Sequence, residues 1–336
     1  MFVRELSDGA EIDQVLLVKR VERRERRDGQ PYLRLGLGDR TGTVRAMVWE
    51  DIEAIDELLA EGEPIHVRGR FSQHPDFGPE IKLADLRRPA AEQVDLSSLR
   101  ESSPRGVDQM ERDLRALLDT IHDPHLRALL DGIFAADCDL WSRYRVAPAA
   151  KYYHQAYPHG LLEHSLGVAQ AVSAIAATFP GIDREVAVTG ALLHDIGKLE
   201  AYAEQGQRVD LTDLGRLHGE IALGYYRVRR MIERIDGFPA EVARAVLHII
   251  LSHHGTLENG SPVVPCTREA TLVHMIDNLG GRLGSFDRLQ RELAPGRSWS
   301  DFDRAIGGAA FFGAPADSTD AAEGPLRPPA PGAEAA

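Results

Sequence analysis

Residues 192–199, with the sequence LLHDIGKL, place His194 directly before Asp195 at the end of an apolar segment that begins at Val186. The apolar pattern predicts a buried helix over Arg184–Ile196. Burying a carboxylate costs several kcal/mol unless a cation, a metal ion or hydrogen-bond donors compensate it. Two interpretations of this doublet are open: a structural ion pair or helix-end cap, and a metal site.

Further imidazoles and carboxylates occur on apolar backgrounds in three other predicted helices, and these are His164, His253, His254 and Asp277. A single histidine on an apolar helix face is usually a core residue. The occurrence of such residues in four helices favours a shared metal site, because helices bring distant residues together. Imidazole and carboxylate ligands suit Mn²⁺, Fe²⁺, Co²⁺ or Zn²⁺, and the sequence does not choose among them.

The N-terminal part alternates short apolar strands with turn residues. We predict five strands and one helix, at Gln14–Val21, Tyr32–Leu37, Thr43–Trp49, helix Asp51–Ala60, Pro64–Phe71 and Glu80–Leu86. Asp28-Gly29 supplies turn residues between the first two strands. Five strands with a helix between the third and the fourth are typical of an OB-fold barrel.

A basic segment, Lys19–Arg27, holds six cations against two acids and is predicted to lie between the first two strands. One interpretation is a solvated hairpin. The other is a surface for single-stranded nucleic acid, in which cations contact phosphates and aromatic rings stack on bases. The candidate substrate contacts are Arg23, Arg24, Arg26, Arg27, Tyr32 and Trp49. Trp49 and Phe71 fit the barrel core equally well.

Helical periodicity replaces strand alternation after residue 108. Two amphipathic helices are expected within residues 108–133, and later ones at Leu161–Thr178, Arg184–Ile196, Arg216–Ile235, Ala240–His253, Arg268–Leu283 and Phe286–Glu292. The domains expected are a barrel at 1–88, a linker at 89–107, an all-α domain at 108–312 and a disordered Ala/Pro/Gly-rich tail at 313–336. The fold class is therefore multidomain, a small all-β barrel followed by an all-α domain.

Composition narrows the class of protein. The 336 residues include 39 basic and 52 acidic ones, a net charge of −13, which argues against bulk electrostatic capture of nucleic acid but leaves local basic patches open. No apolar run approaches the length of a membrane span, and the N-terminus lacks a secretory pattern. We expect a cytoplasmic protein with no membrane partner. Its two cysteines do not form a disulfide framework.

Two resemblances follow from these motifs. Residues 31–44, with the sequence PYLRLGLGDRTGTV, resemble OB domains of the tRNA-anticodon type that bind nucleic acid. The order His, His-Asp, Asp over residues 140–290 resembles the HD-domain metallohydrolase superfamily. That resemblance implies that His164, His194, Asp195 and Asp277 hold one metal, that Asp195 bridges to a second, and that Lys198 lies over the site and stabilises phosphate charge.

A narrower resemblance is to the YhaM-type 3′→5′ exoribonucleases, which also carry an N-terminal OB domain. It lies in residues 150–164 (AKYYHQAYPHGLLEH) and residues 251–255 (LSHHG), and extends over residues 10–290. It implies metal-assisted hydrolysis of single-stranded RNA, with DNA as an alternative, to nucleoside monophosphates. One or two ions are expected, Mn²⁺ before Fe²⁺, Co²⁺, Zn²⁺ or Mg²⁺. Lys151, His154 and Tyr157 are candidate substrate contacts, and a structural loop is an equal interpretation.

The chain departs from this family at residues 217–221, LHGEI, where the usual pattern is Gly-His-Ile and Glu220 replaces the histidine. His218 and Glu220 are both candidate ligands of the second metal, but on one helix they would be about 200° apart and could not both face it. Family spacing favours His253 over His254 as a further ligand, whereas periodicity leaves both open.

Three alternatives stay open. One is an HD phosphohydrolase of a nucleotide or cyclic dinucleotide, although no Gly-Tyr-Pro follows the paired histidines, which disfavours the cyclic-di-GMP class. Another is an HD-like di-iron oxygenase with the same ligand pattern. The third is a nucleic-acid-binding protein with a degenerate site, against which the four retained ligands argue. The sequence gives no indication of the oligomeric state.

Overall fold

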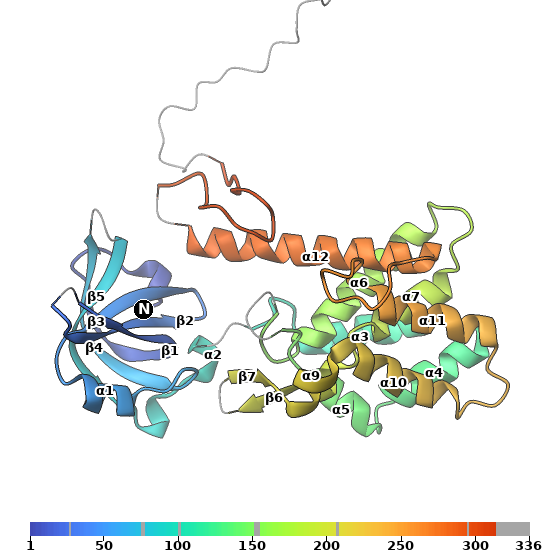
Figure 1. Ribbon diagram of the computed structural model, residues 1–336, viewed down its shortest axis with the longest axis horizontal. Coiled ribbons are helices and arrows are strands. Elements are labelled where there is room, and N and C mark those ends of the chain that lie inside the picture. Colours follow the sequence, from blue (N-terminus) through green and yellow to red (C-terminus); the bar gives the residue numbers. More distant parts are fainter. Residues whose placement is uncertain are drawn as a thin grey trace, which may run out of the picture.

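A β-barrel formed by the first quarter of the chain stands beside a helical domain formed by the rest (Figure 1). The computed structural model describes residues 1–26, 28–74, 78–99, 102–150, 155–205, 208–293 and 296–313. None of the helices in these ranges has the combination of length and apolar character that crossing a bilayer requires. Of the predicted tail at 313–336, all residues after Gly313 lie outside the described residues.

The barrel is built from strands β1 Glu11–Glu25, β2 Pro31–Asp39, β3 Gly42–Val48, β4 Pro64–His74 and β5 Gly78–Arg87. The closed order is β1-β2-β3-β5-β4, in which β1 pairs with both β2 and β4, and β3 pairs in parallel with β5. Helix α1, Ile52–Leu58, lies between β3 and β4 in the chain, and the short 3₁₀ helix η1, Val3–Glu5, precedes β1. The predicted OB-fold barrel is confirmed.

Alternation along the strands divides the aromatic residues between the core and the surface. Leu33, Leu35 and Leu37 of β2 point into the barrel and are almost fully buried. Phe71 is 6% exposed and belongs to this core, whereas Trp49 is 50% exposed. Phe71 is therefore a core residue of the barrel, whereas Trp49 is a surface residue whose ring is available for stacking.

The predicted position of the basic segment was wrong. Strand β1 does not end at Val21 but runs to Glu25, which pairs with Pro31 of β2. The segment therefore lies mostly within a strand, not in a hairpin loop, because its backbone continues the ladder with β2. Arg20 and Arg24 alternate with Arg23 along this strand, and Arg27 lies outside the described residues.

The segment predicted as a linker contains short ordered elements. These are η2, Ala91–Gln93, and α2, Leu96–Leu99. Leu99 is buried, and the backbone N–H of Arg40 on the barrel donates to the carbonyl oxygen of Ser98. Part of this segment is therefore attached to the barrel, and the exact domain boundaries stay a prediction.

The helical domain packs around one apolar core. Its helices are α3 Val107–Leu118, α4 Pro124–Phe134, α5 Asp139–Val146, α6 Gly160–Ala176, α7 Arg184–Leu193, α8 Lys198–Ala201, α9 Asp213–His218, α10 Glu220–Ile232, α11 Ala240–Ser252 and α12 Arg268–Glu292. A two-stranded sheet, β6 Tyr202–Gln205 with β7 Arg208–Leu211, joins α8 to α9. Helix α7 lies at the centre and contacts α6, α11 and α12. The all-α prediction holds except for this small sheet.

Two helix predictions differ from the structure. The helix expected at Arg216–Ile235 is divided into α9 and α10 by Gly219, whose φ of 73° is a left-handed value that a helix interior does not allow. Conversely, the two helices expected at Arg268–Leu283 and Phe286–Glu292 form the single helix α12. This helix extends from the helical domain towards the barrel and contacts β3 (Figure 1).

Gly197 permits a close approach between the turn after α7 and the start of α10. A Cβ atom at this position would lie 1.9 Å from the carbonyl oxygen of Glu220 and 2.6 Å from the backbone nitrogen of Gly224. Both neighbours are backbone atoms, so relief of the clash requires movement of α10. The glycine thereby fixes how near Glu220 lies to the 192–199 segment.

We expect Gly197→Ala to lower the free energy of unfolding by about 1–3 kcal/mol, because the added methyl group overpacks this contact. Urea unfolding followed by circular dichroism measures the change. Gly167→Ala in α6 is the matched control: its Cβ would meet nothing within 4 Å, so stability should stay the same or rise by up to about 1 kcal/mol. Equal stability of Gly197→Ala and wild type would contradict the packing described.

Candidate metal centre

The end of α7 carries the His194-Asp195 doublet into the centre of the helical domain. Asp183 caps the N-terminus of α7, and every residue from Val186 to Leu193 is buried. The helix ends at Leu193, so the doublet lies in the turn that follows. His194 is 1% exposed and Asp195 is 2% exposed. The predicted burial of this pair is confirmed.

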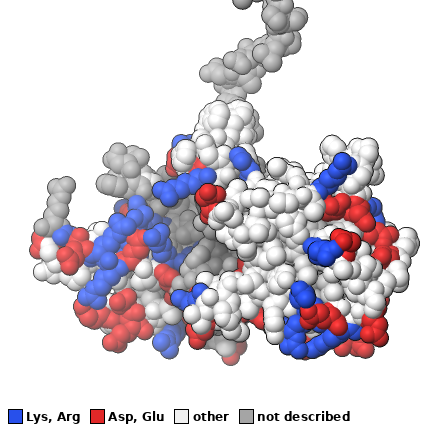
Figure 2. Space-filling model, turned by 45° about the vertical axis from the view of Figure 1, so that its right-hand side comes forward, with Lys and Arg blue, Asp and Glu red and all other residues white. Residues whose placement is uncertain are grey.

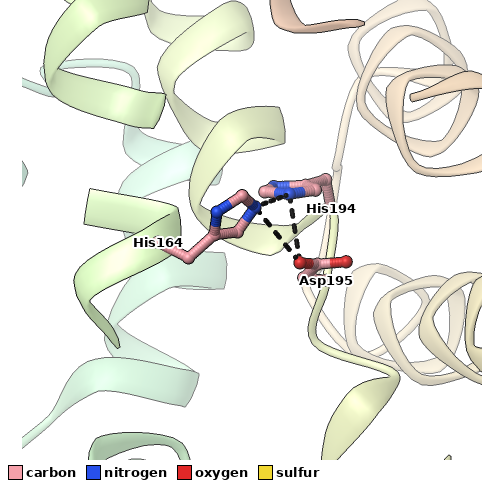
Figure 3. A group of neighbouring side chains, drawn as sticks. All are labelled: His164, His194 and Asp195. Atoms are coloured by element: carbon pink, nitrogen blue, oxygen red, sulfur yellow. Dashed lines mark hydrogen bonds and ion pairs between the residues drawn. The ribbon is translucent and has the colours of Figure 1, made fainter. Parts of the chain in front are cut away.

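His164 of α6 points at the doublet from the facing helix (Figure 3). Its Nε2 atom lies 3.1 Å from His194 Nε2 and 3.4 Å from Asp195 Oδ2. His194 Nε2 is 3.3 Å from the same carboxylate oxygen. Two ring nitrogens and one oxygen therefore converge on a single point.

The other ring nitrogen of His194 fixes which atom faces the cluster. His194 Nδ1 lies 2.7 Å from the carbonyl oxygen of Ala191, and His253 Nδ1 lies 2.8 Å from that of Ile250. A carbonyl oxygen only accepts, so each Nδ1 carries the proton and donates. In the neutral rings the Nε2 lone pairs are consequently directed into the cluster, the arrangement found in metal-binding histidines.

Asp277 of α12 is the fourth residue predicted to hold the first metal, beside His164, His194 and Asp195. Its Oδ1 atom lies 3.0 Å from His164 Nε2 and 3.8 Å from His194 Nε2. Its side chain is 18% exposed, more than those of His164, His194 or Asp195. The four residues predicted for one metal are thus brought together from α6, the end of α7, and α12.

A second group of potential metal ligands, formed by Glu220, His253 and His254, lies on the other side of Asp195. His253 Nε2 is 3.6 Å from Asp195 Oδ1, and His254 Nε2 is 3.4 Å from Glu220 Oε1. Ligand atoms of Glu220, His253 and His254 all lie within 4.8 Å of one another. Both histidines of the pair are close to the cluster, because α11 ends at Ser252 and leaves them in a turn.

His218 is not part of this group. It is exposed at the last residue of α9, and none of the candidate ligand groups among the described residues includes it. The predicted single helix for His218 and Glu220 is wrong, because Gly219 separates α9 from α10. Glu220, the first residue of α10, is the one that faces the cluster.

Three buried ligand atoms have no hydrogen-bond partner among the described residues, and they are Asp195 Oδ1, Glu220 Oε2 and His253 Nε2. A buried polar atom without a partner costs about 1–3 kcal/mol, and more where it is charged. These donors are imidazole nitrogens and carboxylate oxygens, the set that divalent transition metals prefer. The residues present therefore fit a metal centre better than they fit a closed network of ion pairs.

Electrostatics keep the Asp195 carboxylate of the cluster ionised. Burial raises the pKa of Asp195, but Lys198 and His194 outweigh it and hold the pKa well below its usual range. Burial opposes the charge of His194, yet Asp195 raises its pKa to about 9. Burial lowers the pKa of His253 to about 4, so this ring is neutral at pH 7. The cluster consequently combines buried negative charge with a free imidazole lone pair.

Lys198 lies between the two groups. Its ammonium donates to Asp195 Oδ2 at 2.7 Å and lies 3.9 Å from Glu220 Oε2, and its side chain is 13% exposed. Burial lowers its pKa, but Asp195 and Glu220 raise it further above the ordinary value. Lys198 is therefore a mostly buried cation held between the two groups of the cluster.

Two clefts reach this cluster at His164. The interdomain cleft, of about 710 Å³, is lined by Arg40 of the barrel and by Tyr157, His164, Leu279 and Leu283 of the helical domain. The polar cleft, of about 350 Å³, is lined by Asp195, Lys198, His254, Asp277, Asn278 and Arg282. The cluster is therefore accessible from the barrel side and from the opposite side of α12.

Of the three substrate contacts predicted in the helical domain, the structure describes only Tyr157. Tyr157 lines the interdomain cleft, where its hydroxyl donates to Glu163 Oε2 at 2.8 Å. Lys151 and His154 lie outside the described residues. Sequence reasoning missed Asn278 and Arg282, which a helical projection from Asp277 would have placed on the neighbouring face.

Aromatic and basic side chains meet on the barrel surface. The Tyr32 and Trp49 rings stack with their centroids 5.0 Å apart, and the Arg26 guanidinium lies 4.5 Å from the Trp49 ring. Arg23 pairs with Glu53, and Arg24 pairs with Glu22. Figure 2 shows Lys and Arg side chains gathered over the barrel, interspersed with acidic ones.

Comparison with known proteins agrees with both parts of the structure. Residues 161–281 match the HD domain, and residues 15–88 match the OB-fold nucleic acid binding domain. A protein named 3'-5' exoribonuclease YhaM from Shouchella clausii is 26% identical over 90% of this chain and 93% of its own length. The protein of that name from Bacillus subtilis is 28% identical over 86% of this chain and 90% of its own length. The chain is thus a homologue of proteins named 3'-5' exoribonuclease YhaM, and in this chain an OB-fold nucleic acid binding domain precedes an HD domain.

Proposed function

We propose that the chain is a metal-dependent 3′→5′ exonuclease that hydrolyses single-stranded RNA to nucleoside monophosphates. The observation that carries the proposal is the buried cluster of imidazoles and carboxylates at the end of a cleft shared with a nucleic acid binding domain. The names of the homologues agree with this activity. The test below also shows whether single-stranded DNA is a second substrate.

The cluster offers ligands for two divalent ions. We assign His164, His194, Asp195 and Asp277 to one ion, and Asp195, Glu220, His253 and His254 to the other. When bound, such ions activate water and neutralise the charge of phosphoryl oxygens. The additional carboxylate of Glu220 favours Mn²⁺ over ions that prefer softer ligands.

Residues of the chain itself prepare the site for a phosphodiester. Lys198 holds the Asp195 carboxylate through its 2.7 Å contact and presents a positive charge towards the polar cleft. The carbonyl oxygens of Ala191 and Ile250 hold the rings of His194 and His253 in one orientation. Because these groups are fixed before substrate arrives, little reorganisation is needed for the reaction.

The interdomain cleft offers a path for a single strand between the two domains. Arg40 lines it on the barrel side and His164 on the cluster side, while Leu279 and Leu283 of α12 provide an apolar wall. A strand held on the barrel by the Tyr32 and Trp49 rings would enter this cleft and bring its 3′ end to the cluster. Stacking on exposed rings recognises any base, which suits a nuclease without sequence preference.

We expect wild-type protein with Mn²⁺ to shorten 5′-end-labelled single-stranded RNA progressively from its 3′ end, and EDTA to stop the reaction. Asp195→Ala and Asp277→Asn should each lower the rate by more than about 100-fold, above the usual loss for a residue that only supports a ligand. Gel analysis of the labelled products measures this. Phe179→Ala, which removes an exposed ring of the helical domain, is the control.

Near wild-type activity of both variants would refute the site assignment. Cleavage of nucleotides or cyclic dinucleotides without any shortening of RNA would favour the nucleotide phosphohydrolase instead. A parallel reaction with labelled DNA shows whether the sugar matters.

Trp49→Ala should raise the KM for a long single-stranded RNA by about 10-fold, because base stacking on an aromatic ring contributes about 1–3 kcal/mol. The kcat/KM for a dinucleotide should not change, because Trp49 lies at the opposite end of β3 from Arg40, the barrel residue that lines the interdomain cleft. Steady-state kinetics on the two substrates provide the comparison. Tyr226→Ala, which removes another exposed ring, should alter neither. Equal losses on both substrates would rule out a role in strand capture.

Glu220→Ala should lower the metal content of purified, Mn²⁺-equilibrated protein by up to one ion per chain, because a carboxylate ligand is lost. His218→Ala should leave the content unchanged, since His218 is exposed and lies outside the cluster. Mass spectrometry of bound metal gives the count. Loss of metal only in His218→Ala would contradict the assignment, and retention in both would mean that Glu220 is not a ligand.

A further inference from the structure

Helix α12 has two different faces on either side of Asp277. With about 100° of rotation per residue, Leu279 and Leu283 fall on one side of Asp277, and Asn278 and Arg282 fall on the other. The first pair lines the interdomain cleft, and the second pair lines the polar cleft. The helix therefore presents an apolar wall to the barrel side and a hydrogen-bonding wall to the other side.

The polar cleft has the chemistry of a phosphate site. Lys198 and Arg282 contribute positive charge from separate elements, and Asn278 adds an amide. Around the circumference of α12, Gly281 and Ser285 lie between Asp277 and Arg282. These small residues leave the cleft open. Its volume of about 350 Å³ falls within the range of small-ligand sites, which spans about 300–1,000 Å³.

The segment that follows α12 holds Arg282 at this cleft. Arg282 Nη2 donates to the carbonyl oxygen of Ile306 at 3.0 Å. Arg288, further along α12, pairs with Asp303 at 2.5 Å, and Asp303 also accepts from the backbone N–H of Ala305. Ala305 itself lines the cleft. The C-terminal turn, residues 296–313, is therefore fastened to α12 at two arginines.

We propose that Arg282, assisted by Asn278, binds the phosphate of the 3′-terminal nucleotide, and that the C-terminal turn positions Arg282 for this role. The proposal rests on the proposed exonuclease function. A guanidinium offers five N–H donors in a planar fork that matches phosphate oxygens, and the described contacts of Arg282 engage only one of its nitrogens. The upstream strand then occupies the interdomain cleft, and the nucleotide to be released occupies the polar cleft.

The test compares Arg282→Ala, Arg282→Lys and wild type on single-stranded RNA with Mn²⁺. Losing a charge-assisted hydrogen bond to phosphate should lower kcat/KM by about 10- to 100-fold. Inhibition by the product adenosine 5′-monophosphate should weaken by a similar factor, whereas bound metal per chain should stay at the wild-type value. Arg282→Lys should recover part of the loss, because it restores the charge without the fork.

Two further variants separate a local role from a general effect of charge or stability. Arg244→Ala removes an exposed arginine of α11 whose described partner is Glu241, and it should behave as wild type. Asp303→Ala releases the C-terminal turn from Arg288, and it should lower kcat/KM by several-fold without loss of metal. A fall that accompanies metal loss in Arg282→Ala would overturn the proposal.

Unchanged kcat/KM and unchanged inhibition in Arg282→Ala would also overturn the proposed role of Arg282. If the wild-type protein shortens RNA in the same experiment, the exonuclease function is still supported. A wild-type protein that does not shorten RNA would instead refute the proposed function. The two failures are therefore distinguishable in one set of reactions.

Discussion

The buried carboxylate of Asp195 is the constraint on which the helical domain depends. It follows an apolar helix that supplies no compensation of its own, so partners must come from other elements. One oxygen faces Lys198, His164 and His194, and the other faces His253 without a hydrogen bond. Helices α6, α10, α11 and α12 are arranged so that their ligands meet at this group. Fold and chemistry are therefore specified by the same residues.

Helix ends make this convergence possible. His194 and Asp195 follow α7, His253 and His254 follow α11, and Glu220 begins α10. Within a helix, adjacent side chains diverge by about 100°, but in a turn two neighbours can face the same space. This is why consecutive residues serve one cluster, and why helical periodicity left the choice between the paired histidines open.

Patterns local in sequence predicted much of this structure. Strand alternation indicated the five-stranded barrel, and the apolar settings of His164 and the doublet indicated the cluster. The break at Gly219 was missed because a left-handed glycine is compatible with helical periodicity on both sides. The outward position of Trp49 and the turn at 296–313 depend on contacts between distant residues, which periodicity does not contain. Glu220 was a candidate ligand in the sequence, and the break between α9 and α10 is what separates it from His218.

The central claim is that the converging imidazoles and carboxylates form a metal centre. Anomalous diffraction from crystals grown with Mn²⁺ tests it most directly, because it locates the ions without reference to activity. We expect one peak bound by His164, His194, Asp195 and Asp277, and a second bound by Asp195, Glu220 and the paired histidines. A map without peaks at Asp195, or with Mn²⁺ held only by residues elsewhere in the chain, would contradict it.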